Sequence, residues 1–257
     1  MEILNRIELT GIIPVMVVED LNEILPITKA LINGGLDILE VTFRNDNAVD
    51  AILKMKQAFP NILVGAGTVI NKQQVDNAVK VGADFIVCPG FDETVVSYCI
   101  SRKILVIPGC TTPTDIEKAV LNKLDVVKFF PAESFGGMST INALSGPFKN
   151  VRFIPTGGIN EINMNSYLNS NKVIACGGSW MLNATTVSDD KYKEIEEYAK
   201  KTVQELMGLK FNGIEDSFTV LKTKNLRRAI YYLNKMGIIL DDNLRNKTYC
   251  VWIKEDV

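Results

Sequence analysis

Short apolar runs recur along most of this chain at intervals of roughly 20 to 28 residues, and this repeat most constrains the possible folds. Each run is followed by a polar or glycine-containing turn and then by an amphipathic stretch. Such an order is typical of repeated strand–helix units that build a parallel sheet. Eight strands are predicted, at residues 12–17, 37–41, 62–66, 84–88, 104–107, 125–129, 152–155 and 173–176.

Residues between these strands carry helix-boundary signals. Polar caps precede predicted helices over 21–32, 72–81 and 114–121, namely Asp20, Asn71 and Thr112 with Pro113 in the first turn. Glycines follow helix ends, at Gly34, Gly35 and Gly82. A segment rich in Lys and Glu, 189–207, supplies the last helix. Eight such units predict an α/β fold, a (β/α)8 TIM barrel over 1–208 with a short N-terminal helix, rather than an open doubly wound sheet.

The pattern changes beyond Gly208. Residues 218–236 are predicted to form an amphipathic helix, and residues 237–240 and 248–253 two strands around a turn at 241–243. This small C-terminal α+β extension, 209–257, is too short to carry a strong core of its own. We therefore expect it to dock on the barrel or on a neighbouring subunit, in a role that the sequence does not reveal.

Charge and hydropathy limit the possible partners. The net charge is −2, which gives no electrostatic reason to expect nucleic acid or an anionic membrane as a partner. No apolar run approaches the roughly 20 residues of a membrane span, and the first residues lack a basic segment followed by a long apolar one. We expect a cytoplasmic protein whose partner is a small molecule.

The chain contains no histidine. This excludes Ser-His-Asp and Cys-His catalysis and the histidine-rich zinc sites of metal-dependent aldolases. Five scattered cysteines never form a Cys-x-x-Cys pair, so we expect reduced core thiols and neither disulfides nor a metal site. Chemistry must use Lys, Glu, Asp, Tyr, Cys or Arg, and no cofactor is expected.

Lys128 is the most informative residue, because it interrupts the apolar strand 125–129. A lysine that points into a barrel mouth is partly desolvated, which favours the neutral amine that attacks ketones. The alternative is a lysine that reaches outward between helices. The active site of a TIM barrel lies at the carboxyl ends of its strands. Glu40 and Arg44, at the end of another strand, favour the catalytic interpretation.

Three further residues fit a keto acid substrate. Glu40 lies within an apolar strand and is the best candidate for moving protons, although it could instead belong to a structural ion pair. Arg44 can bind a carboxylate through two parallel hydrogen bonds, unless it is simply a surface loop residue. Thr68, just after the third strand, can add a hydroxyl donor.

Glycines follow both the seventh and the eighth strand. Gly157 and Gly158 come after residues 152–155, and Gly178 precedes Ser179 after residues 173–176. A single Gly-Gly pair is usually just a turn. At the ends of these two strands, however, the backbone of this fold commonly approaches a phosphate, so the pairs predict a phosphorylated substrate.

Six ordered motifs together closely resemble those of the bacterial 2-keto-3-deoxy-6-phosphogluconate (KDPG) and 4-hydroxy-2-oxoglutarate (KHG) aldolase family. They are Leu-Glu-Val-Thr-Phe-Arg at 39–44, Gly-Ala-Gly-Thr-Val at 65–69, Pro-Gly at 89–90, Lys-Phe-Phe-Pro-Ala-Glu at 128–133, Pro-Thr-Gly-Gly-Ile at 155–159 and Gly-Gly-Ser-Trp at 177–180. The resemblance spans roughly residues 6–207. It implies a homo-oligomeric class I aldolase, commonly trimeric, that cleaves its sugar-acid phosphate to pyruvate and glyceraldehyde 3-phosphate.

The resemblance also implies roles for individual residues. Lys128 would be the Schiff-base lysine and Glu40 the general acid and base, acting partly through water. The remaining roles fall into three groups: Arg44, Thr68 and Thr156 would hold the pyruvate carboxylate and neighbouring oxygens, Pro89 and Phe130 would shape the pocket, and Gly157, Gly158, Gly178 and Ser179 would meet the phosphate.

Two features depart from the family pattern. The first strand ends in Val-Met-Val-Val-Glu at 15–19, where some relatives carry an arginine. The resemblance therefore leaves open one anion contact and the substrate range, which can include 4-hydroxy-2-oxoglutarate. The extension after Gly208 is absent from the shortest members. Two alternative functions remain from the residues alone: a non-covalent isomerase or epimerase that uses Glu40 as base, and a non-catalytic binding or scaffold protein.

Overall fold

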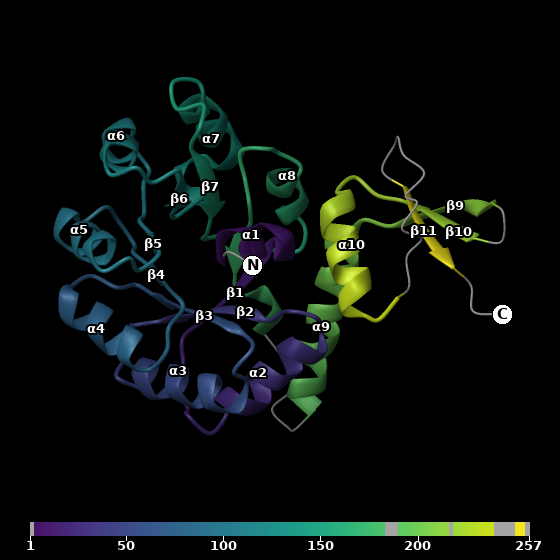
Figure 1. Ribbon diagram of the computed structural model, residues 1–257, viewed down its shortest axis with the longest axis horizontal. Coiled ribbons are helices and arrows are strands. Elements are labelled where there is room, and N and C mark those ends of the chain that lie inside the picture. Colours follow the sequence, from purple (N-terminus) through teal and green to yellow (C-terminus); the bar gives the residue numbers. More distant parts are fainter. Residues whose placement is uncertain (1–2, 183–189, 216–217, 239–249, 255–257) are drawn as a thin grey trace.

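The computed structural model describes residues 3–182, 190–215, 218–238 and 250–254. Strands and helices alternate from β1 onward, and the strands pair in parallel. One curled six-stranded sheet has the order β5-β4-β3-β2-β1-β8, and a second parallel pair joins β6 to β7 (Figure 1). The bounds are β1 Ile12–Met16, β2 Ile38–Thr42, β3 Leu63–Gly67, β4 Phe85–Val87, β5 Val106–Ile107, β6 Val126–Phe129, β7 Arg152–Pro155 and β8 Cys176–Gly178.

Isolated parallel bridges lie on both sides of the β6-β7 pair. On the β5 side, Gly109 pairs with Lys128, whose backbone N–H donates to the carbonyl oxygen of Pro108 at 2.9 Å. On the β8 side, Phe153 pairs with Val173, and Thr156 pairs with Gly177. The predicted α/β fold with a parallel sheet is confirmed.

The eighth strand begins later than predicted. Residues 173–176 carry the β-branched and apolar side chains, yet β8 runs over Cys176–Gly178 and pairs with β1. Val173 makes only a single bridge to β7. The register of β8 on β1, with Cys176 opposite Ile12, decides where β8 begins. The strand preference of residues 173–176 does not decide it.

Helices surround the sheet on its outer side (Figure 1). The capping predictions for Asn71 and Thr112 are confirmed, because Asn71 accepts from the N–H of Gln74 and Thr112 forms a capping box with Asp115. The capping prediction for Asp20 is wrong. The side chain of Asp20 accepts from the N–H of Asn22 in a turn, and the helix begins at Ile24 instead of Leu21. The helices are α1 Ile3–Thr10, α2 Ile24–Asn33, α3 Asn47–Ala58, α4 Lys72–Lys80, α5 Glu93–Ser101, α6 Pro113–Leu121, α7 Gly137–Ser145, α8 Met164–Leu168 and α9 Asp190–Met207, with short 3-10 turns η1 Glu133–Phe135 and η2 Trp180–Leu182.

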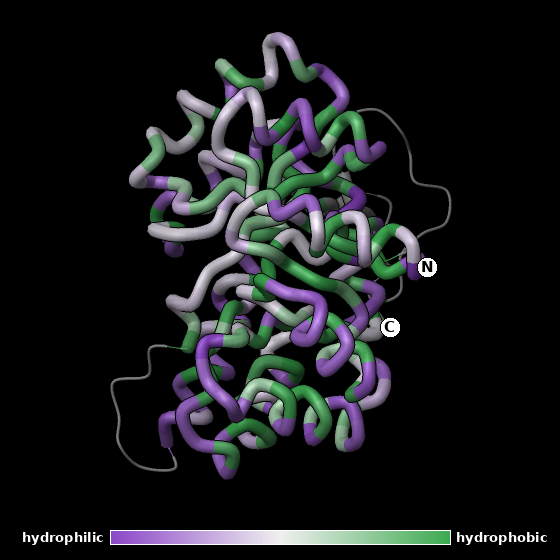
Figure 2. The backbone as a smooth tube through the Cα atoms, turned by 90° about the vertical axis from the view of Figure 1, so that its left-hand side faces the viewer, coloured by the Kyte–Doolittle hydropathy of each residue, from purple (hydrophilic) through white to green (hydrophobic). Residues whose placement is uncertain are grey.

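The core lies between the strands and the helices and also inside the curled sheet. Every residue of β2 and of β6 is buried, including their charged members. Figure 2 shows the hydrophobic backbone segments in the interior and hydrophilic ones on outer turns and helix faces. Burial of apolar surface on both faces of parallel strands supplies the main stabilising free energy of such a fold and fixes the strand ends that carry polar groups.

The C-terminal extension forms a three-stranded antiparallel sheet, β11-β10-β9, beside one helix, α10 (Figure 1). Its bounds are β9 Lys210–Glu215, β10 Phe218–Lys222, α10 Leu226–Lys235 and β11 Cys250–Lys254. The prediction of one helix over 218–236 is wrong for its first part, because Phe218–Lys222 pairs with both neighbouring strands. Asn225 then caps α10 by accepting from the N–H of Arg228. The strand predicted at 248–253 corresponds to β11, whereas that at 237–240 begins in a turn and, with 241–243, reaches outside the described residues.

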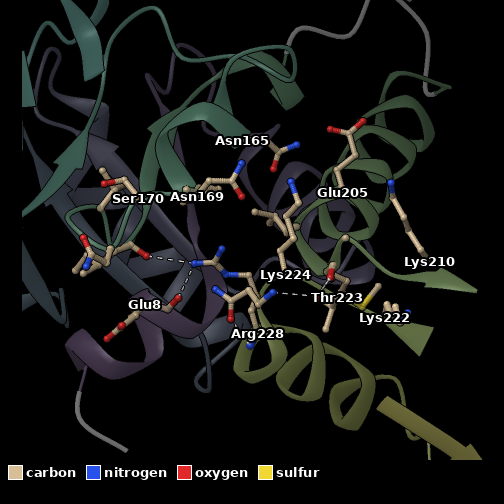
Figure 3. A pocket seen from close by; sticks show the side chains of 18 residues that line it. Glu8, Asn165, Asn169, Ser170, Glu205, Lys210, Lys222, Thr223, Lys224 and Arg228 are labelled. Atoms are coloured by element: carbon tan, nitrogen blue, oxygen red, sulfur yellow. Dashed lines mark hydrogen bonds between the residues drawn. The ribbon is translucent and has the colours of Figure 1, made fainter. Parts of the chain in front are cut away.

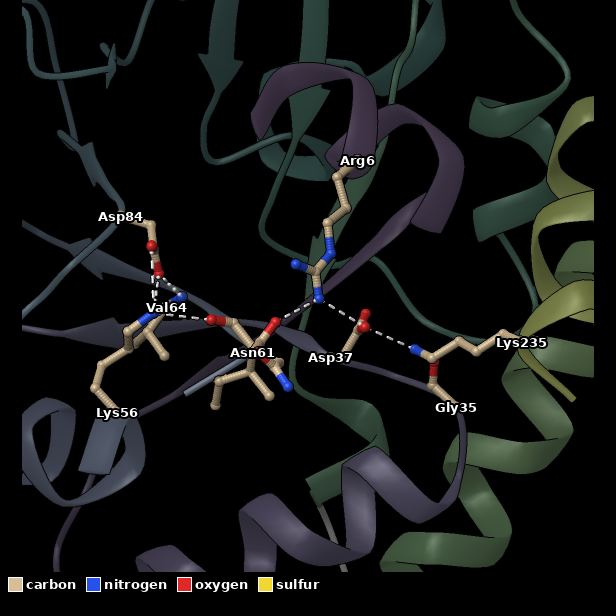
Figure 4. Close-up of polar contacts among 9 residues, drawn as sticks. Arg6, Gly35, Asp37, Lys56, Asn61, Val64, Asp84 and Lys235 are labelled. Atoms are coloured by element: carbon tan, nitrogen blue, oxygen red, sulfur yellow. Dashed lines mark hydrogen bonds and ion pairs between the residues drawn. The ribbon is translucent and has the colours of Figure 1, made fainter. Parts of the chain in front are cut away.

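Helix α10 docks on the amino-terminal end of the strands, as expected for an extension without a strong core. The hydroxyl of Tyr232 donates to the carbonyl oxygen of Thr10 at 2.7 Å. Lys235 forms an ion pair with Asp37 at 2.9 Å, and Asp37 also pairs with Arg6 at 2.7 Å (Figure 4). Asp37 therefore links α1, the start of β2 and the extension.

Within the described ranges, no helix combines the length and the apolar character that crossing a bilayer would need.

Candidate active site

Lys128 and Glu40 face each other inside the curled sheet. Lys128 is the third residue of β6 and Glu40 the third of β2, and their side chains are 7% and 3% exposed. The ammonium nitrogen of Lys128 donates to Oε1 of Glu40 at 3.1 Å. Removal of two charges from water is costly unless they are paired, so each side chain compensates the other. The structure thus brings together the two residues that the sequence singled out for catalysis.

Gly67 makes room for this pair. A methyl group at Gly67 would lie 2.2 Å from Oε1 of Glu40, so only glycine admits the carboxylate here. Gly109, just after β5, instead lets two backbone segments approach each other, because a methyl group there would lie 2.2 Å from the carbonyl oxygen of Pro89. Neither glycine was predicted to have a role. The Gly-Ala-Gly sequence at 65–67 was the available signal for Gly67, because glycine inside a strand often marks a close approach.

Phe130 comes two residues after Lys128, and its ring lies against the lysine side chain. The ammonium nitrogen of Lys128 is 5.3 Å from the centroid of the Phe130 ring, within the range of a cation–π contact. The peptide bond between Phe130 and Pro131 is cis. Pro89, which follows β4, is half-buried. Of the two residues predicted to shape the pocket, Phe130 contacts the lysine directly.

Two threonines lie just past strand ends. Thr68 has a φ of 58°, a left-handed conformation that is uncommon for a residue other than glycine and often marks functional segments. Thr156 is buried, and its backbone forms a bridge with Gly177. A methyl group at Gly177 would lie 2.4 Å from Oγ1 of Thr156, so this glycine makes space for the hydroxyl.

The turn after β7 brings backbone atoms close to η1. Gly157 and Gly158 have φ angles of 97° and 80°, which glycine adopts without strain. The N–H of Glu133 donates to the carbonyl oxygen of Gly157, and Asn163 donates to that of Gly158 at 2.9 Å. A side chain at Gly158 would meet that of Glu133. Both carbonyl oxygens of this turn therefore accept hydrogen bonds from the neighbouring segments.

The second glycine pair belongs to β8 itself. Gly178 is buried at the strand end, and a methyl group there would overlap the ring of Trp180. Ser179, the next residue, is exposed. Both glycine pairs thus lie at the carboxyl ends of strands, on the same side of the sheet as Thr156.

Arg44 lies apart from the buried pair. It follows β2 by two residues, is exposed, and lines a small cavity of about 370 Å³ with Asp46, Gln74 and Asn77. Its guanidinium makes no hydrogen bond or ion pair with any side chain that the structure describes. Of the predicted substrate-binding residues, Phe130 contacts Lys128, whereas Arg44 faces this separate cavity.

Two cysteines lie near Lys128, and the sequence predicted no role for them beyond the core. Cys88 directly follows β4 and is 1% exposed, and the N–H of Cys110 donates to the carbonyl oxygen of Lys128. Burial raises the pKa of the Cys88 thiol to about 12, and the Glu40 carboxylate adds to the effect while Lys128 opposes it. A thiol held neutral in this way is a poor nucleophile.

The cysteines with described side chains, Cys88, Cys99, Cys110 and Cys176, are all buried and free, as predicted. The side chain of Cys250 lies outside the described set. Among the described residues, no group of three or more acidic or cysteine side chains is arranged to hold a metal ion.

Known proteins resemble this chain over most of its length. The family model for KDPG and KHG aldolase matches residues 3–198. The 2-dehydro-3-deoxy-phosphogluconate aldolase of Treponema pallidum (strain Nichols) is 40% identical, over 79% of this chain and 96% of its own length. The KHG/KDPG aldolase of Escherichia coli (strain K12) is 39% identical, over 75% of this chain and 91% of its own length.

Solved structures show the same fold. KDPG aldolase from Legionella pneumophila, with pyruvate captured at low pH as a covalent carbinolamine intermediate, superposes with a TM-score of 0.75 at 33% identity, over 79% of this chain and 98% of that one. The 2-keto-3-deoxy-6-phosphogluconate aldolase of Zymomonas mobilis ATCC 29191 gives a TM-score of 0.74 at 36% identity, over 79% and 96%. With a buried Lys–Glu pair inside its sheet and relatives that match most of its length, this chain belongs to the KDPG and KHG aldolase family and is a carbon–carbon lyase.

Proposed function

We propose that the chain is a class I aldolase that cleaves 2-keto-3-deoxy-6-phosphogluconate to pyruvate and glyceraldehyde 3-phosphate. The observation that carries the proposal is the buried ion pair of Lys128 and Glu40, with 3.1 Å between Nζ and Oε1. An amine that must form an imine with a ketone needs a proton acceptor beside it and protection from bulk water. Cys88, the nearby thiol, is held neutral and does not compete.

Glu40 moves the protons of the reaction. It takes a proton from the Lys128 ammonium, and the neutral amine then adds to the ketone carbon C2. Glu40 returns a proton to the carbinolamine oxygen, water leaves, and the cationic imine forms. Glu40, ionised again, takes the proton of the C4 hydroxyl as the C3–C4 bond breaks. Glyceraldehyde 3-phosphate leaves, and the bonding electrons move onto the imine nitrogen to give the enamine. Protonation of the enamine carbon C3 and hydrolysis of the imine release pyruvate and restore the Lys128 amine.

Charge complementarity supports this sequence of steps. The imine cation occupies the place of the Lys128 ammonium, so Glu40 stabilises it without any rearrangement of the site. The face of the Phe130 ring, 5.3 Å from Nζ, adds a weaker attraction for the same cation. The oriented carboxylate and ring are thus matched to the charge that carries the bond cleavage.

The other residues bind the two ends of the substrate. Arg44, Thr68 and Thr156 hold the pyruvate carboxylate and neighbouring oxygens, and Pro89 and Phe130 form the pocket walls. For Arg44 this role requires the exposed side chain to turn toward Lys128 when substrate binds. The guanidinium of Arg44 has no hydrogen-bond or ion-pair partner among the described side chains, which supports such a movement.

The phosphate binds where backbone N–H groups are accessible. Gly157, Gly158, Gly178 and Ser179 serve this purpose at the ends of β7 and β8. The positive φ angles of Gly157 and Gly158 support the assignment, because such turns can direct successive N–H groups to one anion. The name of the E. coli relative supports 4-hydroxy-2-oxoglutarate as a second substrate, cleaved to pyruvate and glyoxylate.

The architecture that we infer is a closed (β/α)8 barrel over 1–208 followed by a separate extension over 209–257. The bridges from β5 to β6 and from β7 to β8 support the closure. Leu121 and Ile162 are 82% and 88% exposed, which supports burial in a homo-oligomer, a trimer by family resemblance. Buried free thiols support a cytoplasmic location.

Borohydride trapping tests the covalent step. With pyruvate and borohydride, mass spectrometry of the digested protein should find the reduced pyruvyl adduct on Lys128. Lys128→Ala should lose both the adduct and pyruvate release, whereas Lys118→Ala, a control at an exposed lysine on α6, should keep both. Pyruvate release without labelling of Lys128 would overturn the Schiff-base mechanism. Conversion of the keto acid to an isomer, without labelling or pyruvate release, would favour a non-covalent isomerase or epimerase. A folded protein without any activity on either keto acid would favour a binding or scaffold protein.

A further inference from the structure

A large cavity lies at the opposite end of the strands from Lys128, between the barrel and the extension. Its volume is about 1190 Å³, which is ample for a small metabolite. One wall comes from α8 and the turn before β8, and another comes from the end of α9, β9, β10 and the start of α10 (Figure 3). The cavity therefore exists only because the extension is docked on the barrel.

Arg228 is a buried cation in this cavity without a carboxylate partner among the described residues. It is 4% exposed, and its guanidinium donates only to backbone carbonyl oxygens: Nη2 to Glu8 at 3.0 Å and to Ile174 at 3.4 Å. Nε donates to Leu9 at 3.3 Å, and Nη1 makes no hydrogen bond with a described residue. Burial lowers the pKa of Arg228, as expected where solvation is lost without full compensation by an acid.

The barrel is shaped to receive this guanidinium. Gly11, between α1 and β1, has a φ of 76°, and a methyl group there would lie 2.5 Å from Cζ of Arg228. Asn225, which also lines the cavity, caps the same helix and fixes the backbone N–H of Arg228. The position of the cation is thus set by the barrel and by the helix together.

Further cations line the same cavity. They are Lys210, Lys222 and Lys224, all exposed, and none forms an ion pair with a carboxylate whose side chain the structure describes. Two acids also line it. Glu8 is already paired with Arg152 at 3.1 Å, which leaves Glu205 as the one described carboxylate there without an ion-pair partner. The lining has an excess of positive charge, although the whole chain has a net charge of −2.

Neutral hydrogen-bonding groups face the cations. Asn165, Asn169 and Ser170 come from α8 and the turn after it, on the side opposite α10 in Figure 3. Amides and hydroxyls of this kind bind hydroxyl groups, whereas the guanidinium and the ammonium groups bind oxyanions. The amino end of α10 also carries a partial positive charge, which favours an anion near Asn225.

We propose that this cavity is a second ligand site, which binds a small hydroxylated metabolite bearing phosphate or carboxylate groups. Arg228 anchors the anion, Lys222 and Lys224 neutralise the remaining charge, and Asn165 and Asn169 contact the hydroxyl groups. The bound anion supplies the missing counter-charge for the buried guanidinium and joins the extension to the barrel. The site is distinct from the catalytic pair, which lies at the other end of the strands.

Calorimetric titration of the full chain tests this proposal, with inorganic pyrophosphate and citrate as probes at an ionic strength fixed by sodium chloride. Both probes are oxyanions, as the proposed ligand is. A difference between their affinities shows whether the site prefers phosphate or carboxylate groups. The test variant is the double substitution Lys222→Gln and Lys224→Gln at exposed positions. Its matched control is Lys80→Gln with Lys118→Gln, two exposed lysines far from the cavity. A third variant, Arg228→Met, is titrated after circular dichroism has shown that it folds.

At least one probe should bind both the unaltered chain and the control variant. The same probe should bind the double variant at least tenfold more weakly. The rate constant kcat/KM for cleavage of the phosphorylated keto acid should stay within twofold in the double variant, which separates this site from the catalytic one. Equal affinity of the double variant and its control would overturn the proposal. So would binding of neither probe, or a loss of affinity that is matched by a tenfold loss of kcat/KM.

Discussion

The ammonium nitrogen of Lys128 lies 3.1 Å from Oε1 of Glu40, although the two residues are 88 positions apart in the chain. The contact joins β6 to β2 across the interior of the sheet. It places an acid and a base where neither is solvated by bulk water. The geometry therefore ties the chemistry of the site to the curvature of the sheet, and several outcomes can be predicted from it.

Glu40→Gln should keep the shape of the side chain and remove its charge. We expect kcat to fall by about 10² to 10⁴, the usual contribution of a positioned general acid and base. Steady-state pyruvate release measures this, and the rate of borohydride trapping by pyruvate should fall as well. Glu117→Gln, at an exposed position on α6, is the control and should keep its rate. An unchanged kcat in Glu40→Gln would contradict the role of Glu40.

Gly67→Ala should displace the Glu40 carboxylate, because the added methyl group would lie 2.2 Å from Oε1. We expect a loss of about 1 to 3 kcal/mol in the free energy of unfolding from overpacking, and a larger loss of activity than this destabilisation explains. Urea unfolding and kcat measurements on the same sample separate the two effects. Gly90→Ala, which has no atom within 4 Å of the added methyl, should keep its stability. Full activity in Gly67→Ala would show that the carboxylate position is not critical.

Buried thiols should make the protein less stable at alkaline pH. Burial raises the pKa of Cys88 to about 12 and that of Cys99 to about 11 in the folded protein, whereas a free thiol has a pKa of about 8.5. The unfolded chain therefore loses protons first as the pH rises. The stabilisation is complete below about pH 8.5 and declines as the pH approaches the folded pKa values, by at most about 1.4 kcal/mol per pH unit for each thiol.

Urea unfolding under reducing conditions between pH 8 and pH 10.5 measures this decline. Cys88→Ala should show a shallower decline than the unaltered chain, because one linked proton is removed. At pH 8 the folded protein should also resist alkylation at Cys88 and react only after unfolding. Rapid alkylation of Cys88 in the folded state would contradict the raised pKa.

Asp37→Asn should weaken the attachment of the extension. Asp37 pairs with Arg6 at 2.7 Å and with Lys235 at 2.9 Å, and it is only 15% exposed. Loss of its charge leaves two cations close together in a half-buried place, and we expect a cost of about 1 to 3 kcal/mol. Chemical unfolding measures the cost, and limited proteolysis should cut sooner after Gly208. Asp50→Asn on α3 is an exposed control, and equal stability of the two variants would argue against the network.

Local patterns in the sequence were sufficient for much of the fold. Apolar runs gave the strands, because parallel strands buried on both faces require such runs. Asn71 and Thr112 gave helix starts, because capping depends on residues only three positions apart. Residues 218–222 were misassigned, because that segment has no helix-breaking residue and becomes a strand only through pairing with β9 and β11. Strand preference of this kind depends on neighbours that are distant in sequence.

The sequence by itself determined which residues could do chemistry. Absence of histidine removed most alternatives, and Lys128 and Glu40 were conspicuous as charges within apolar strands. Only the tertiary structure decided that these two charges meet, that Gly67 makes room for them, and that Arg44 lies apart. The cavity around Arg228 likewise forms only where the extension docks on α1, α8 and α9. Hydrophobic periodicity specifies elements over a few residues, whereas a site requires side chains from distant elements to converge, and that depends on the register and curvature of the parallel sheet.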